Sequence, residues 1–289
     1  MSAPVFLDYD QERLDALLDA RRMTPDWQDY ADRFEARSAQ VRASTGAVLD
    51  VRYGGHERER LDVFLPSGAT GPVPVNVFFH GGYWRSADKE RYSFIADTFR
   101  PAGAAYVAVE YALIPTVDMD ELVRQCRAAI AHLYANGRSL GIDPDRIFVS
   151  GHSAGGQIVG MLAAAGWHES FGVPTDVIKG ACGISGLYDL EPIRLSYLNP
   201  TLALTPASSQ RNSPAFLPPA SAAPFVAAVG GAEGDEFARQ NALVAEQWGG
   251  VVDVTTISLP GANHYMAVEA LGTPSSDLAA LVLDQMGRA

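Results

Sequence analysis

After Pro74 the chain alternates short apolar runs with segments of helical periodicity, and this alternation restricts the fold more than any other feature of the sequence. The apolar runs are typical of buried strands and cover residues 75–79, 104–109, 147–150, 178–184, 224–229 and 252–259. The helical segments cover residues 89–99, 119–134, 154–165, 236–248 and 276–285. Such alternation predicts a mostly parallel sheet with helices on both faces, whose working residues lie at the carboxyl ends of the strands.

Three further segments complete the predicted organisation. Residues 48–53 and 61–65 have strand character and a turn between them, which predicts an antiparallel pair and a sheet of about eight strands. Residues 1–45 are predicted to form a helical amino-terminal arm, and residues 46–289 one α/β domain. Residues 190–224 hold seven prolines, so we expect an irregular, lid-like insertion there.

Charge and the amino terminus restrict partners and location. The net charge of −12 argues against a surface that binds nucleic acid. Acidic residues stand where a signal peptide would need a basic start, and no long apolar run predicts a membrane span. We therefore expect a cytoplasmic protein that acts on small molecules, as a monomer or a homodimer. Cys126 and Cys182 fall in a helical and a strand pattern, which indicates buried side chains and neither a disulfide nor a metal pair.

The most specific motif is Gly-His-Ser-Ala-Gly-Gly at residues 151–156, directly after a predicted strand and directly before a predicted helix. In that context Gly-x-Ser-x-Gly is a nucleophile elbow, a tight turn that exposes one serine hydroxyl. The motif predicts Ser153 as the nucleophile. The turn also directs the amide of Ala154 at an incoming carbonyl oxygen.

A serine hydroxyl needs a base to accept its proton. Of the six histidines, His264 is the one that follows the last predicted strand, and chain order after the serine favours it as the base. The orienting carboxylate should follow the preceding strand, where Glu233, Asp235 and Glu236 stand. We favour Glu233 because it lies in the loop itself, whereas Asp235 and Glu236 fall in a first helical turn. Asp235 and, after the previous strand, Asp189 remain alternatives.

The segment His80-Gly81-Gly82-Tyr83-Trp84 follows another predicted strand. Paired glycines let backbone amides approach a substrate, so this loop is expected to complete an oxyanion hole made by the amides of Gly82, Tyr83 and Ala154.

Together with these two motifs, Gly183-Ile184-Ser185-Gly186-Leu187-Tyr188-Asp189-Leu190 makes the chain resemble the kynurenine formamidase (arylformamidase) branch of the α/β-hydrolase serine esterases, which is related to the hormone-sensitive-lipase-like esterases. The resemblance runs from about Pro25 to the end. It implies the α/β-hydrolase fold and oxyanion donors at Gly82 and Tyr83. The matching acid in that branch is usually aspartate, and Glu233 departs from it.

The expected function is that of a serine hydrolase, a carboxylesterase that cleaves small acyl or aryl esters without cofactor or metal. One alternative is an N-formylkynurenine formamidase of tryptophan breakdown, and another is a non-catalytic module that binds ligands on the same fold. Tyr83, Trp84 and Tyr188 are expected to line the substrate pocket. Arg85 and Arg194 are candidates for a substrate carboxylate.

Overall fold

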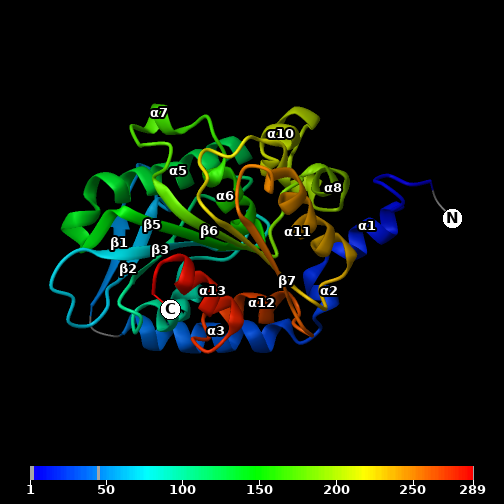
Figure 1. Cartoon of the computed structure of the whole chain (residues 1–289). Coiled ribbons are helices and arrows are strands. Elements are labelled where there is room, and N and C mark those ends of the chain that lie inside the picture. The colour runs from blue at the N-terminus through cyan, green and yellow to red at the C-terminus, as the bar shows by residue number, and fades with distance from the viewer. Residues whose placement is uncertain (1–2, 44–45, 289) are drawn as a thin grey trace.

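The computed structural model describes residues 3–43 and 46–288, and its centre is a sheet of eight strands in the order β1-β2-β4-β3-β5-β6-β7-β8 (Figure 1). β1 pairs with β2, and β2 with β4, in antiparallel register, while all other neighbours are parallel. The strands are β1 (Ala47–Arg52), β2 (Arg60–Phe64), β3 (Val73–Phe79), β4 (Ala105–Val109), β5 (Ile142–His152), β6 (Ile178–Ile184), β7 (Phe225–Gly230) and β8 (Val254–Leu259). The predicted fold class is confirmed.

Helices cover both faces of this sheet because its central strands are apolar on both sides. On β3, Val75, Val77 and Phe79 pack into one core and Phe78 into the other. One face carries α5 (Met119–Asn136), α6 (Ala154–Ala163) and α11 (Asp235–Trp248); the other carries α3 (Trp27–Arg42), η1 (Glu90–Ile95), α4 (Ala96–Phe99), α12 (His264–Leu271) and α13 (Asp277–Gln285) (Figure 1). Two short elements, η2 (Gly137–Leu140) and α7 (His168–Phe171), pack against the same core as α5, α6 and α11.

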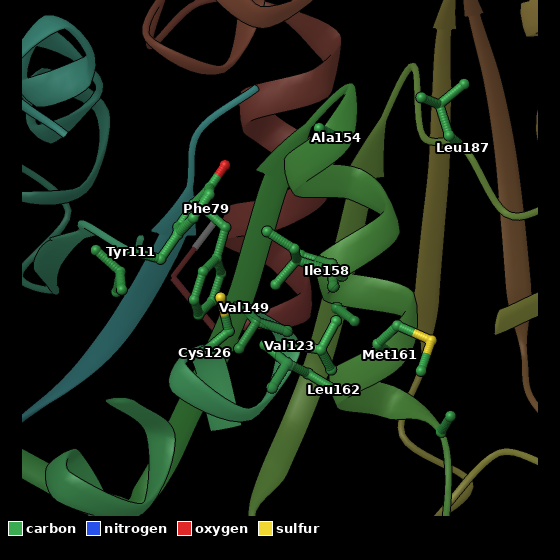
Figure 2. Close-up of a cluster of buried hydrophobic side chains, with 14 of the residues drawn as sticks. Phe79, Tyr111, Val123, Cys126, Val149, Ala154, Ile158, Met161, Leu162 and Leu187 are labelled. Atoms are coloured by element: carbon green, nitrogen blue, oxygen red, sulfur yellow. The ribbon is translucent and has the colours of Figure 1, made fainter. Parts of the chain in front are cut away.

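The core between α5, α6 and the sheet fixes the direction of α6. Figure 2 shows Ile158 and Leu162 of α6 beside Val149 of β5, with Val123 and Cys126 of α5 completing the cluster. These five side chains are at most 1% exposed. Burial of this kind stabilises a fold by about 1.5–3 kcal/mol for each large aliphatic side chain, so the amino end of α6 is held firmly against the end of β5.

The amino-terminal segment is helical, as predicted, and it packs on the rest of the chain. It contains α1 (Gln11–Leu18), α2 (Ala20–Met23) and α3, and the side chain of Asp10 caps α1 by accepting a hydrogen bond from the backbone N–H of Arg13. α1 contacts α11, and α3 contacts η1. The predicted boundary after residue 45 falls at residues 44–45, outside the described residues, so the division into arm and domain stays a prediction.

Residues 190–224 differ from the predicted irregular segment, because they form a series of short helices. These are α8 (Glu191–Leu195), α9 (Asn199–Leu202), α10 (Pro206–Arg211) and η3 (Pro214–Phe216), and each has a proline at its first or second position. Proline suits a first helical turn because its fixed φ is already helical and its missing N–H has no intrahelical partner there. The prolines therefore start helices here, and the role of the segment as a lid stays a prediction.

Within residues 3–43 and 46–288, no helix combines the length and the apolar character needed to cross a membrane.

Candidate active site

Ser153 stands alone between β5, which ends at His152, and α6, which begins at Ala154. Its backbone has φ 57° and ψ −117°, a strained conformation for a residue with a side chain. The strain is held in place because the Ser153 N–H donates to the carbonyl of Ile184 at 2.8 Å, at the end of the neighbouring strand β6. The turn has the conformation that the Gly-x-Ser-x-Gly motif predicts.

Gly155 lets the first turn of α6 approach β3. A Cβ at this position would lie 1.9 Å from the carbonyl oxygen of Phe79, closer than any real contact. The loop after β3 crosses Ser153 in the same tight way, since a Cβ on Gly81 would lie 3.1 Å from the Cβ of Ser153. The two glycine-containing motifs, distant in sequence, are therefore in contact around the serine.

The loop of residues 80–84, which we call the oxyanion loop, has an unusual backbone. Gly82, Tyr83 and Trp84 have φ values of 105°, 48° and 57°. Within the described part of the chain, no group accepts a hydrogen bond from the amide N–H of Gly82, Tyr83 or Ala154. Three unpaired backbone donors beside a serine are what an oxyanion hole requires.

The oxyanion loop is anchored to the rest of the protein by two of its own side chains, those of Trp84 and His80. The indole N–H of Trp84 donates to Oε1 of Gln157 on α6 at 3.0 Å. His80 stacks on Tyr111 with ring centroids 4.3 Å apart, and its Nε2 lies 3.1 Å from Oε1 of Glu110. Burial opposes ionisation of Glu110, but the contacts with His80, Arg58 and a backbone amide outweigh it and lower the pKa of Glu110.

His264 and Glu233 are joined by a hydrogen bond of 2.5 Å between Nδ1 and Oε2. Glu233 is 1% exposed, and its other oxygen accepts bonds of 2.6 Å from the hydroxyl of Ser185 and the amide of Gly230. With Nδ1 engaged by the carboxylate, the remaining ring nitrogen of His264 is free for proton exchange. His264 and Ser153 line the same cavity.

His264 is the first residue of a helix, α12, which is not among the helical segments predicted from the sequence. Asn263 caps this helix by accepting bonds from the N–H groups of Tyr265 and Met266. The short segment 264–271 escaped the periodicity analysis, although Asn before a helical run is a typical start signal. The cap fixes the backbone that carries the imidazole.

The other carboxylates considered from the sequence lie elsewhere. Asp235 is the first residue of α11, has a side chain 73% exposed and lies 3.4 Å from Arg13. Asp189 pairs with Arg239 at 3.0 Å. Of the three candidates, the structure brings only Glu233 to the imidazole.

His152 lies beside His264 and contacts both its backbone and its ring. Its Nε2 donates to the backbone carbonyl of His264 at 3.0 Å, and the two ring centroids are 4.4 Å apart. Burial, and then the neighbouring His264, lowers the pKa of His152 well below its ordinary value. His152 is therefore neutral at physiological pH and adds no charge beside His264.

A cavity of about 680 Å³ opens above Ser153, and one of its walls comes from the amino-terminal helices. Its lining includes Ala20 and Arg21 of α2 and Trp27, Ala31 and Phe34 of α3. This wall was not predicted from the sequence. The spacing of Trp27, Ala31 and Phe34 indicates one helix face, but nothing in the sequence says what that face covers.

Only one of the three predicted pocket residues lines this cavity. Tyr83 does, and its hydroxyl donates to the carbonyl of Leu18 at 2.5 Å, which ties the oxyanion loop to α1. Trp84 and Tyr188 are 0% exposed and belong to the hydrophobic core, so their prediction as pocket residues is wrong. Trp84 turns inward to reach Gln157, and Tyr188 packs against Phe225 at 5.9 Å.

Three arginines line the cavity, Arg21, Arg85 and Arg91, together with one carboxylate, Asp19, whose side chain accepts a hydrogen bond from the backbone N–H of Arg22. Arg21 lies over the ring of Trp27, 4.3 Å from its centroid. Arg194, the second cation proposed from the sequence, instead forms two bonds of 2.8 and 2.6 Å with Glu191 and is not part of the lining. An aromatic wall with cations at its rim suits a flat ligand that carries a negative group.

Comparisons with known protein sequences place the chain among hydrolases. A family model described as BD-FAE matches residues 61–185, which include both glycine-containing motifs. The kynurenine formamidase of Danio rerio is 31% identical over 267 residues, which cover 90% of this chain and 88% of the relative.

Solved structures agree on the fold. A candidate thioesterase from Silicibacter sp. TM1040 has a TM-score of 0.82 at 29% identity, with 93% of this chain and 98% of that one covered. A hyperthermophilic esterase from Pyrobaculum calidifontis has a TM-score of 0.71 over 94% of this chain and 95% of that one. At 19% identity the second match supports the architecture alone.

Proposed function

The chain belongs to the kynurenine formamidase family and is a serine hydrolase; from this premise we propose that Ser153 is its nucleophile and an aryl formamide its substrate. The observation that carries the proposal is the cavity itself, in which Ser153 and His264 lie beside aromatic side chains and a rim of arginines. The similarity to kynurenine formamidases over most of the chain argues against the non-catalytic alternative.

The first half of the reaction forms an acyl-enzyme. His264 takes the proton of the Ser153 hydroxyl as the oxygen attacks the formyl carbon, and the carbonyl oxygen becomes an oxyanion. Glu233 holds the imidazole through Nδ1 and stabilises the imidazolium that forms. The amides of Gly82, Tyr83 and Ala154 are the proposed oxyanion donors, and each such donor contributes about 10²–10³-fold to kcat.

The second half releases both products. Protonated His264 gives its proton to the departing aryl amine, which leaves the formyl group on Ser153. A water molecule then attacks the ester carbon while His264 accepts its proton, and formate leaves as Ser153 recovers its hydrogen. Each proton removed is returned within the cycle.

The lining of the cavity supports an aromatic substrate with a negative group. Trp27, Phe34 and Tyr265 provide apolar ring surface, and Arg21, Arg85 and Arg91 provide hydrogen-bond donors for a carboxylate. A substrate with its acyl group at Ser153 and its charged end at this rim would use both features.

Small acyl or aryl esters are the second candidate substrates. Nothing in the proposed triad or oxyanion hole requires a nitrogen leaving group. The expected cytoplasmic location and the monomeric or homodimeric state stay predictions.

Initial rates distinguish the two substrate classes. We expect kcat/KM for N-formyl-L-kynurenine to exceed that for p-nitrophenyl acetate, butyrate and octanoate by about tenfold or more, or about 1.4 kcal/mol of transition-state binding. Ser153→Ala should abolish both activities and labelling by a fluorophosphonate. Higher rates on the short esters would select the carboxylesterase, and activity retained by Ser153→Ala would refute the proposed nucleophile.

A further inference from the structure

We propose that Ser185 is a positioning residue that fixes the carboxylate of Glu233 for its contact with His264. The proposal rests on the proposed function, because it assigns Ser185 a role in the same triad. Ser185 follows the last residue of β6, and its side chain is fully buried.

The contacts of Glu233 divide cleanly between its two oxygens. Oε1 accepts 2.6 Å bonds from the Ser185 hydroxyl and the Gly230 amide, and Oε2 lies 2.5 Å from Nδ1 of His264. Two donors on Oε1 fix the rotation of the carboxylate, and this leaves Oε2 directed at the imidazole. Glutamate has one more rotatable bond than aspartate, so its carboxylate needs such anchoring more.

Ser185 is the only side chain among the described residues that donates to Oε1. The second donor is a backbone amide in a crowded place, since a Cβ on Gly230 would lie 2.7 Å from the same oxygen. The carboxylate of Glu233 therefore lies between the carboxyl ends of β6 and β7 and contacts both. Loss of the Ser185 hydroxyl leaves no other side chain there to take its place.

The backbone conformation of Ser185 also supports its role as a positioning residue for Glu233. Its φ of 50° is unfavourable for a residue with a side chain, and its N–H donates to the carbonyl of Ala228 on β7 at 2.7 Å. Strain of this kind persists where surrounding contacts enforce it, and it is concentrated at functional sites. Here it places the hydroxyl above the carboxylate.

The consequence for catalysis is specific. When the carboxylate is free to rotate, it stabilises the imidazolium less, so kcat falls while substrate binding is unchanged. The acid limb of the kcat/KM profile should move to lower pH for the same reason. The titratable groups that face His264 are Glu233, His152 and Tyr265, and Ser185→Ala changes the contacts of Glu233 alone among them.

The test is a double-mutant cycle on p-nitrophenyl acetate, whose good leaving group keeps slow variants measurable. We expect Ser185→Ala to lower kcat about tenfold with KM within twofold of the unmutated enzyme, and to lower it less than twofold in a Glu233→Ala background. Ser185→Cys fills the space of the hydroxyl with a slightly larger thiol that donates only weakly, so it should show the same loss. This second variant covers a possible folding defect of the first.

Ser150→Ala is the matched control, because Ser150 is also buried at the end of a strand and donates to Oδ1 of Asn76 at 2.5 Å. It should leave kcat and the acid limb unchanged. Full activity in both Ser185 variants, or an equal loss with and without Glu233, would overturn the inference. Either result would leave the proposed function intact as long as Ser153→Ala remains inactive.

Discussion

Trp84 and Gln157 join the oxyanion loop to the helix that follows the nucleophile, through a buried hydrogen bond of 3.0 Å. Gln157 also donates to the carbonyl of Asn212 at 2.9 Å, so one amide connects the oxyanion loop, α6 and the segment after α10. Because Trp84 has a positive φ, the loop needs this support to keep its shape.

Gln157→Leu should therefore lower both stability and activity. It leaves the indole N–H and the Asn212 carbonyl without partners, at a cost of about 1–3 kcal/mol for each buried group. Thermal unfolding and kcat measure the two effects. An unchanged kcat in a destabilised protein would show that the loop holds its conformation without Gln157.

Gly155→Ala should prevent native folding or destabilise the protein by more than about 3 kcal/mol, because the new Cβ would overlap the carbonyl of Phe79. Gly250→Ala is the control, since a Cβ there meets nothing within 4 Å. Chemical denaturation of the two variants gives the comparison. Equal stabilities would contradict the close approach of α6 to β3.

Glu233→Gln should lower kcat by about 10²–10⁴-fold, since the amide cannot stabilise the imidazolium. Asp235→Asn should change kcat less than twofold, because the side chain of Asp235 is exposed and pairs with Arg13 at the surface. Steady-state kcat values of the two variants on one substrate show which carboxylate acts with His264. The reverse order would move the role of the acid to Asp235.

Arg85→Ala should raise KM for N-formyl-L-kynurenine about tenfold, as expected for a lost charge-assisted hydrogen bond, and leave KM for p-nitrophenyl acetate unchanged. Arg194→Ala serves as the control, because its guanidinium is engaged by Glu191 outside the cavity. If KM for the charged substrate stayed constant in Arg85→Ala, this arginine would have no part in recognising the carboxylate.

Glu110 should make stability depend on pH. Its pKa is lowered in the folded protein, so its contribution is fully present above its unfolded pKa of about 4.3 and is lost as the pH falls through the lower folded value. Unfolding by urea at pH 7, 5 and 3.5 should show a gap between the unmutated protein and Glu110→Gln that is constant at the two higher values and shrinks at the lowest. A gap that grows on acidification would contradict this.

The sequence predicted the parts of the site that local chemistry determines. The Gly-x-Ser-x-Gly motif needs a strand, a strained turn and a helix, and the structure has each of them at Ser153. The directions of Trp84 and Tyr188 were not predictable, because either aromatic could face a core or a cavity until its neighbours were known. Tertiary packing decided both, through Gln157 and Phe225.

The sequence predicted the amino-terminal helices but not their place in the lining of the cavity. Periodicity shows which face of α3 is apolar, whereas only the packed structure shows that this face overlooks Ser153. The prolines of residues 190–224 predicted an irregular segment for a similar reason. A proline excludes the helix interior but allows the first turn, and a sequence of short helices uses only first turns.

Because α2 and α3 contribute one wall of the cavity, the residues proposed for catalysis and the residues of this wall lie in different parts of the chain. The proposed triad and oxyanion donors are encoded from residue 82 onwards, while part of the cavity wall is encoded upstream of the first strand. Diversification of Trp27, Ala31 and Arg21 could therefore change which acyl donors are accepted with the bond-breaking apparatus left as it is. For directed evolution, α2 and α3 therefore offer a short segment in which substrate preference can be varied separately from the proposed catalytic residues.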